Sequence, residues 1–429
     1  MNITIGVMEM ENRKIKVMSL SDHPMMPSGV AHSMRNILNK LVDSGKFEVL
    51  SLGGGVSKHP NYNPVFVKDG WVIYPIDDFG TQDIIRKAIR EYRPDILLYQ
   101  TDPRFFVHLH EMEHEIRQNV STVWYGIWDN YPYPMFNKPV WSSVDHFVSI
   151  SKVTQDCFEN VVGDAVKSTY IPHSVNLNIF KKLPESDVEA FKRETLVGVH
   201  PDAFIAFWNN RNGLRKLPAT LMMWWKDFLE ENNLRGKAHL IMHTDPVDQA
   251  GQNLPAILKD FNFAEGDVIF STTKVDELVL SKFYNMADVV VNIADAEGFG
   301  LGTLEALACE TPIIVNMTGG LQEQVTDGTN WFGVGIEPAS KIILGDVVAC
   351  PYIYQDRISK GDFLAAMKKM YSMSKEDRNK LGSLGRKHVE TNYNFDNLHE
   401  KWVNLLEDTY ETNGSWPNKN FKSYEFTEI

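Results

Sequence analysis

Short apolar runs separated by amphipathic stretches recur along almost the whole of this 429-residue chain. The runs are three to six residues long, which suits buried strands, and the apolar residues between 30 and 41 fall on one face of a helix. This alternation predicts α/β layers with parallel strands. The predicted strands are Lys16–Leu20, Phe47–Leu52, Trp71–Tyr74, Ile96–Tyr99, Thr122–Ile127, His146–Ser149, Phe204–Trp208, His239–Met242, Val268–Phe270, Val289–Asn292 and Pro312–Val315.

The alternation loosens around residues 172–200, and the chain is too long for one compact domain. We therefore predict an N-terminal Rossmann-like domain over 1–180 and a second one over 181–395. A C-terminal helix and tail over 396–429 is expected to pack back toward the N-terminal domain. The fold class is α/β with two doubly wound domains facing a cleft, and ligands of such sheets bind at the carboxyl ends of the strands.

Composition excludes several classes of protein. With 43% hydrophobic and 23% charged residues, the chain is neither disordered nor of low complexity. Its formal charge of −13 gives no general attraction to nucleic acid, although residues 1–180 hold 17 Lys+Arg against 20 Asp+Glu and are nearly neutral. Three cysteines, no secretory leader and no long apolar window predict a soluble, cytoplasmic protein without disulfides or a transmembrane segment.

The densest group of candidate binding residues follows the strand at 289–293. Glu297 and Glu305 bracket a glycine-rich turn that opens a helix, and a helix N-terminus offers unpaired N–H groups to a phosphate. Carboxylates accept hydrogen bonds from sugar hydroxyls. The alternative is an ordinary strand-to-helix turn with solvated acids. The turn comprises Gly298, Phe299, Gly300, Leu301, Gly302 and Thr303.

A second candidate group lies directly after the first strand of the second domain. Arg211 and Lys216 are separated by four residues across a glycine-containing turn, so both can point at one anion. The alternative is a basic loop ahead of a helix. Because both turns follow strands of the same domain, we expect them to converge on one site of the size of a diphosphate.

Two segments of the first half could add ligand contacts. Gly29 ends the polar loop between the first strand and the first helix, where a ligand would touch the N-terminal domain. Asp129 follows an apolar strand and stands among aromatic residues, whose faces commonly stack on sugars or bases. The alternative for this second segment is a hydrophobic corner stiffened by prolines.

The pentad His110-Glu-Met-Glu-His114 matches H-E-x-x-H, a zinc-binding pattern when it lies on one helix. Its neighbours Glu113 and Glu115 are charged where a buried zinc helix is apolar, and no third ligand stands out downstream. We interpret the pentad as a surface helix of the first domain and predict no metal site.

Three motifs together resemble the retaining glycosyltransferases of family 4, which have the GT-B fold. Residues 297–305, followed by Pro312-Ile-Ile-Val and the Gly319-Gly320 pair, are similar to the E-x7-E region of that family. Residues 211–216 resemble its phosphate-binding R-x4-K turn, and residues 171–180 resemble its domain-linking segment. The sequence departs from the family at Ser28-Gly29, where members often have Gly-Gly, and at Asp129, where many have His.

The resemblance implies a metal-independent, retaining transfer of a sugar from a nucleotide-diphosphate sugar to an acceptor hydroxyl. In this interpretation Arg211 and Lys216 hold the diphosphate, Glu305 the ribose hydroxyls and Glu297 the hydroxyls of the sugar. Asp129 touches the sugar from the other domain. Base recognition is expected near His243 and Phe270, and no cofactor is needed besides the co-substrate.

Two alternatives remain open at the level of the sequence. Some segments of the chain also resemble glycosyltransferases of tailed bacteriophages. This resemblance suggests DNA with hydroxymethylated bases as an alternative acceptor and the host cytoplasm as the location. The second alternative is a non-catalytic, sugar-binding GT-B module. The sequence names neither the base nor the sugar, which could be a hexose or a pentose, and it leaves the acceptor and the oligomeric state open.

Overall fold

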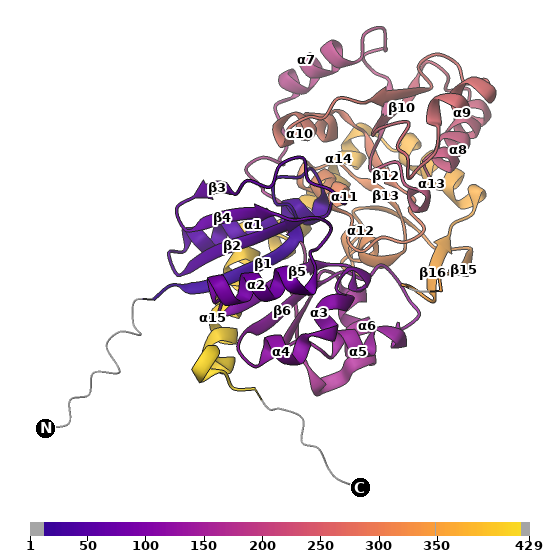
Figure 1. The fold of residues 1–429 in the computed structure, drawn as a ribbon. Coiled ribbons are helices and arrows are strands. Elements are labelled where there is room, and N and C mark those ends of the chain that lie inside the picture. Colours follow the sequence, from indigo (N-terminus) through magenta and orange to yellow (C-terminus); the bar gives the residue numbers. More distant parts are fainter. Residues whose placement is uncertain (1–12, 348, 422–429) are drawn as a thin grey trace, which may run out of the picture. The chain divides into compact units, whose positions relative to one another are not determined.

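The computed structural model describes residues 13–347 and 349–421, whose contacts divide them into two compact units (Figure 1). Unit 1 contains the described residues of 13–128, 133–172 and 396–421. Unit 2 contains residues 129–132 together with those of 173–395. The chain thus passes from the first unit to the second at 172–173, against a predicted boundary at 180, and returns at 395–396.

Unit 1 is built on an eight-stranded sheet of order β3-β4-β2-β1-β5-β6-β7-β8, parallel except for the β3–β4 pair. The edge strands β3 and β8 were not predicted, because β8 is polar and β3, although apolar, is short and largely exposed. The strands are β1 Ile15–Asp22, β2 Phe47–Gly54, β3 Val65–Lys68, β4 Trp71–Pro75, β5 Ile96–Thr101, β6 Ser121–Gly126, β7 His146–Ser149 and β8 Lys167–Tyr170.

Helices cover both faces of this sheet, and Figure 1 shows α2 in front of it and α15 (yellow) behind it. The ring of Trp402 on α15 packs edge-on against Tyr125 of β6 at 4.9 Å, and Trp402 is buried. The helices of unit 1 are α1 Gly29–Asp43, α2 Gln82–Tyr92, α3 Val107–Glu111, α4 Glu113–Arg117, α5 Lys138–Trp141, α6 Lys152–Val162 and α15 Phe395–Asn413.

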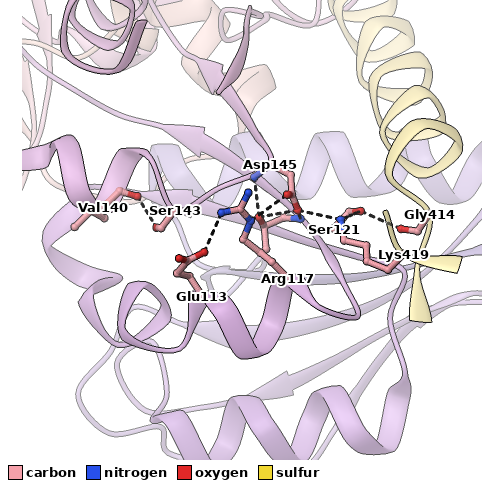
Figure 2. A network of polar contacts seen from close by, with 9 residues as sticks. Glu113, Arg117, Ser121, Val140, Ser143, Asp145, Gly414 and Lys419 are labelled. Atoms are coloured by element: carbon pink, nitrogen blue, oxygen red, sulfur yellow. Dashed lines mark hydrogen bonds and ion pairs between the residues drawn. The ribbon is translucent and has the colours of Figure 1, made fainter. Parts of the chain in front are cut away.

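The chain after α15 is tied to unit 1 by polar contacts near the amino ends of β5, β6 and β7. Figure 2 shows Lys419 reaching Asp145 at 3.3 Å and Ser121 at 2.9 Å. Asp145 also pairs with Arg117 at 3.0 Å. Further along the same edge, the Oγ of Ser415 donates to Asp95 at 2.5 Å. The sequence assigned no regular structure to this tail.

Unit 2 contains a six-stranded, fully parallel sheet of order β11-β10-β9-β12-β13-β14. Successive residues of its central strand β9 point to opposite faces, as the geometry of a strand requires. Phe207 stacks on Phe283 of α10, whereas Trp208 belongs to the core under α8 and α13. The strands are β9 Phe204–Asn209, β10 Ala238–His243, β11 Val268–Ser271, β12 Val289–Asn292, β13 Ile313–Asn316 and β14 Gly333–Ile336.

The helices of unit 2 cover both faces of its sheet, and a two-stranded antiparallel hairpin, β15–β16, extends the unit. Three helices, α13, α14 and α15, follow the hairpin in the chain. The sequence did not predict the hairpin. These elements are α7 Glu185–Thr195, α8 Pro218–Glu231, α9 Leu254–Asp260, α10 Glu277–Met286, α11 Leu301–Ala308, α12 Gln322–Val325, β15 Ser340–Leu344, β16 Ile353–Arg357, α13 Lys360–Ser372 and α14 Lys375–Asn392.

Each sheet changes the direction of its strand order once, next to its first strand. In unit 1 this point lies between β1 and β5, and in unit 2 it lies between β9 and β12. Loops that leave two neighbouring strands in opposite directions open a crevice at their carboxyl ends, and that crevice is where doubly wound sheets bind ligands. In unit 2 the two loops are 210–217 and 293–300.

Candidate functional site

The loops at the carboxyl ends of β9 and β12 bring Lys216, Arg215 and Glu297 together. The Nζ of Lys216 is paired directly with the Glu297 carboxylate, and Nη1 of Arg215 lies 3.8 Å from the same carboxylate. The backbone carbonyl of Ala296 accepts a hydrogen bond of 2.5 Å from Arg215. Two cations therefore face one carboxylate at the direction change of the sheet, as the two loops were predicted to converge.

Burial and charge act on this pair in opposite senses. Burial alone would raise the pKa of Glu297, which is 7% exposed, but Lys216 and Arg215 together bring that pKa below its ordinary value. Burial and the neighbouring Arg215 lower the pKa of Lys216, while Glu297 opposes this shift. The Glu297 carboxylate is therefore ionised at neutral pH and compensates the buried cations.

Asp129 lies at the edge of this cluster. Its Oδ2 is 3.7 Å from Nη2 of Arg215, and its backbone carbonyl lies against Gly319. The sequence expected Asp129 to approach the sugar from the first domain. The structure instead groups residues 129–132 with unit 2, although residues on both sides of them belong to unit 1.

The glycine-rich turn is shaped by close backbone approaches. Gly300 precedes α11 with φ +94°, a left-handed conformation that favours glycine, and its Cβ would lie 2.6 Å from Leu321. Phe299 is buried, and its ring contacts His173 edge-on at 5.1 Å. The hydroxyl of Thr303 bonds within the turn, at 2.8 Å from the Gly300 carbonyl. The side chains of Phe299 and Thr303 thus stabilise the turn. The backbone of Gly298 belongs to the loop, and the backbone of Leu301 and Gly302 forms the start of α11.

Glu305, on α11, is bound by a neutral donor rather than a cation. The Tyr284 hydroxyl donates to its Oε2 at 2.6 Å and itself accepts from Asn209 at 2.8 Å. Burial raises the pKa of Glu305 to about 8, although the Tyr284 hydroxyl opposes this. Asn209 ends β9, so Glu305 faces the same strand end as the Lys216 loop does.

Arg211 is not brought to this cluster. Its side chain is 71% exposed and forms a two-pronged pair with Asp248, at 2.7 and 3.1 Å. Sequence spacing selected Arg211 and missed Arg215. The signal that favours Arg215 is its place beside Lys216 in the short 3-10 turn Leu214–Lys216, which the loop sequence alone did not reveal.

The two residues proposed for base recognition lie on adjacent strands. His243 ends β10, and its Nδ1 lies 2.9 Å from Ser271 Oγ at the end of β11. Phe270 is half-buried against the core of unit 2. Burial lowers the pKa of His243. Both residues thus stand at the carboxyl edge of the sheet, His243 two strands and Phe270 three strands from β12.

Gly29 belongs to unit 1, where it is the first residue of α1 after the N-cap Ser28. The Ser28 hydroxyl donates to Asp22 at 2.5 Å, and burial raises the pKa of Asp22. Asp22 lines a cavity of about 610 Å³ at the carboxyl ends of the unit 1 strands. Arg104 and His108 also line it, so this unit has its own polar crevice.

The pentad at 110–114 does not lie on one helix. α3 ends at Glu111 and α4 begins at Glu113, which separates the two histidines by a break at Met112 and corrects the prediction of a single helix. Within 13–347 and 349–421 no group of three or more His, Cys, Asp or Glu side chains is arranged to hold a metal ion. No helix of these residues is both long and apolar enough to traverse a bilayer.

Comparison with known proteins finds a likeness of sequence within unit 2. Residues 228–343, within unit 2, match the family model "Glycosyl transferases group 1". A D-inositol 3-phosphate glycosyltransferase of Kineococcus radiotolerans is 30% identical over 174 residues, which are 40% of this chain and 39% of that protein. The match thus spans about two fifths of the length of this relative.

Solved structures resemble the chain over nearly its whole length. The sucrose-phosphate synthase of Thermosynechococcus elongatus has a TM-score of 0.74 at 16% identity, covering 93% of this chain and 100% of the other. A glycosyltransferase of Rickettsia africae has a TM-score of 0.67 at 14% identity, covering 93% and 98%. Anabaena HepE, solved with UDP and glucose, has a TM-score of 0.66 at 15% identity, covering 92% and 100%.

The predicted α/β class and GT-B fold are confirmed by these likenesses and by the two sheets, one fully parallel and the other parallel except at β3–β4. The identities to solved structures are too low to carry more than the fold. The chain has the GT-B fold, and its sequence likeness to the group 1 glycosyl transferases lies in unit 2.

Proposed function

We propose that the chain is a glycosyltransferase that binds a nucleotide-diphosphate sugar in unit 2 and transfers the sugar to an acceptor hydroxyl. The observation that carries this proposal is the buried Lys216–Glu297 pair with Arg215 at the direction change of the sheet, next to the start of α11. The match to the group 1 glycosyl transferases over 228–343 supports it.

The arrangement suits a diphosphate leaving group. In the structure Lys216 is neutralised by Glu297. When the donor binds, the phosphates become the partners of Lys216 and Arg215, and the hydroxyls of the sugar donate to Glu297. Cations placed where negative charge develops lower the barrier to departure of the diphosphate. These side chains and the N-terminus of α11 perform the role that a metal ion plays elsewhere, so the proposed reaction is metal-independent.

Arg211 joins the site in this proposal by exchanging one oxyanion for another. Its guanidinium forms a two-pronged pair with Asp248 on the surface, and the same fork fits a phosphate. Glu305 accepts hydrogen bonds from the ribose hydroxyls, and the base binds at the sheet edge formed by His243 and Phe270.

The proposed transfer retains the configuration at the anomeric carbon. The bond from this carbon to the phosphate oxygen breaks as the acceptor oxygen bonds to the same face, through an oxocarbenium-like state. The acceptor proton passes to the leaving phosphate oxygen, so charge and atoms balance. Asp129, beside Arg215, is placed to contact the transferred sugar.

The acceptor is proposed to bind in unit 1, whose cavity at the carboxyl ends of its strands contains Asp22 and Arg104. A half-buried carboxylate and an exposed guanidinium can bond to the hydroxyls of a polar acceptor. UDP-sugars are the first donors to test, because the structural relative HepE was solved with UDP and glucose.

The test is incubation of the protein with UDP-, GDP- and ADP-sugars, followed by measurement of nucleoside diphosphate release. Proton NMR of the first sugar product reports its configuration. We expect release from at least one donor, with the anomeric configuration retained and activity unchanged by a metal chelator. No turnover of any donor, with binding intact, would instead favour a sugar-binding module. An inverted first product would refute retention.

A further inference from the structure

Residues 129–132 are joined to the rest of unit 2 by an amide side chain. Asn130 is 2% exposed, and its Nδ2 lies 2.7 Å from Asp356 Oδ2 and 3.1 Å from the Tyr354 carbonyl. Its Oδ1 accepts from the Tyr131 N–H at 2.9 Å. A carboxylate and a carbonyl on one side and an N–H on the other fix which way this amide points.

Asp356, on β16, is itself held in place. The Thr318 hydroxyl donates to the same Oδ2 at 2.8 Å, and the Asp356 N–H donates to the Asp295 carbonyl at 2.8 Å. The Tyr354 N–H of the same strand donates to the Tyr131 carbonyl at 2.6 Å. The hairpin that the sequence did not predict thus binds residues 129–132 through both side-chain and backbone hydrogen bonds.

The Asn130–Asp356 contact lies only one residue along the chain from the candidate site. Asp129 directly precedes Asn130, and its carboxylate is 3.7 Å from Arg215. The N–H of Asp295 donates to the Arg215 carbonyl at 2.9 Å, so the hairpin contact is continuous with the backbone of the loop that carries Lys216. Movement of the Asn130 amide would therefore displace the neighbouring Asp129.

The charges around position 130 explain why an amide stands there. Asp295 and Asp356 are both nearly fully buried, and the cations facing them are Arg357, 2.8 Å from Asp295, and Lys341, 3.9 Å from Asp356. Asn130 adds a donor to this acidic group without adding charge. Removing a buried donor leaves its acceptor unsatisfied, which is costly when the acceptor is a carboxylate.

We infer that Asn130 and Asp356 form a positioning pair that holds Asp129 beside Arg215 for the sugar-transfer step. The inference rests on the proposed function and adds two residues to it. Neither residue contacts the proposed donor, so both act through Asp129. The pair should therefore affect the rate of transfer more than the binding of the donor.

The test is a double-mutant cycle in the full chain. We expect Asn130→Asp to lower kcat at pH 8 at least tenfold, because two carboxylates then face each other, with the donor KM changed less than threefold. The loss should shrink as the pH falls and one of the facing carboxylates takes up a proton. Asp356→Asn should also lower kcat. The double variant N130D/D356N, in which the new amide donates to the new carboxylate, should return to within threefold of the wild type.

Asn330→Asp is the matched control. Asn330 also bonds to an aspartate, Asp327, at 3.0 Å, but in an exposed turn of unit 2. UDP binding near one site per chain shows that each variant is folded. Asn130→Ser, which keeps a small hydrogen-bond donor, is a milder second variant, and we expect it to lower kcat three- to tenfold.

Full kcat in N130D and N130S, or a double variant no better than its single parents, would overturn the inference while leaving the proposed function intact. The absence of turnover in the wild type would overturn the proposed function and the inference together. Equal losses in kcat for N330D and N130D would also contradict a specific positioning role.

Discussion

Glu305 is a carboxyl group placed next to a hydroxyl in a site that is otherwise rich in cations. The Tyr284 hydroxyl is its hydrogen-bond donor at 2.6 Å, and no lysine or arginine is among the groups that shift its pKa. Lys216 and Glu297, in contrast, compensate each other directly. The site thus contains two different acidic groups. Glu297 is ionised and paired with a cation, whereas Glu305 has a raised pKa and is bonded to a hydroxyl.

This difference predicts a pH dependence of stability. The pKa of Glu305 rises on folding from 4.5 to about 8, so the native state holds its proton more tightly than the unfolded chain does. The contribution of this group is fully present below pH 4.5 and is lost as the pH rises to about 8. We expect the Tm of the wild type to fall relative to that of Glu305→Gln between pH 5 and pH 8, as measured by calorimetry.

The control for this series is Glu265→Gln, a substitution of an exposed glutamate in the same unit. Its Tm should follow that of the wild type at every pH. A constant difference between the wild type and E305Q over this range would contradict the raised pKa of Glu305.

At the scale of elements, the loop after β13 closes on the glycine-rich turn with no room for a side chain. Gly319 has φ +48°, and a Cβ there would lie 1.9 Å from the carbonyl oxygen of Glu297 and 2.6 Å from that of Asp129. The N–H of Gly320 donates to the same Glu297 carbonyl at 2.9 Å. The backbone of Glu297 is thus held in place by the loop that contains Gly319 and Gly320.

We expect Gly319→Ala to abolish turnover and to lower stability by more than about 3 kcal/mol, because backbone atoms must move. Gly328→Ala is the matched substitution: Gly328 also has positive φ, +93°, but nothing lies within 4 Å of its Cβ position. It should cost only about 1 kcal/mol and retain activity. Urea unfolding and turnover measure both effects, and similar losses in the two variants would contradict the close approach.

The sequence supported predictions at this scale unequally. Buried parallel strands such as β9 and β12 were predicted because burial on both faces leaves a continuous apolar run. The β15–β16 hairpin was not, because its two strands pair only with each other in the sheets, β15 is exposed along its length, and β16 is mostly polar and half-buried. The α/β class and the convergence of two loops were therefore accessible from the residue pattern, and the GT-B fold was accessible from the family resemblance.

Contacts between distant segments were not accessible in the same way. Arg215 and Arg211 are equally plausible partners for Lys216 by spacing, and only the local turn and the distant Asp248 separate them. The buried contact of Asn130 with Asp356 joins positions 226 residues apart, and neither position lies in a recognisable motif.

At the scale of the whole chain, the last described residues belong to the first unit rather than to the unit that precedes them in sequence. The side chain of Lys419 is 1% exposed and reaches Asp145, which also binds Arg117 (Figure 2). Trp416 stacks under the guanidinium of Arg93 at 3.9 Å and donates from its indole to the Pro94 carbonyl at 2.9 Å. The tail therefore fastens α15 to the amino edge of the unit 1 sheet.

We expect Lys419→Ala to lower the Tm by several degrees, because removing a buried charged donor leaves the Asp145 carboxylate with fewer partners. UDP affinity should change less than threefold, since the proposed nucleotide site lies in unit 2. Lys401→Ala, at an exposed position of α15, is the control and should leave the Tm unchanged. A loss of UDP affinity of more than threefold in K419A would contradict this prediction, because the tail would then act on unit 2 as well.

In the proposed function, the Lys216–Glu297 pair at the ends of β9 and β12 supports transfer of a sugar from a nucleotide donor. The most direct test measures steady-state turnover of the preferred nucleotide sugar by the wild type, Lys216→Ala, Glu297→Ala and the exposed control Lys259→Ala, all shown to be folded by circular dichroism. We expect at least a hundredfold loss of kcat in K216A and E297A and none in K259A. Unchanged turnover in either of the first two variants would contradict the proposed role of the pair.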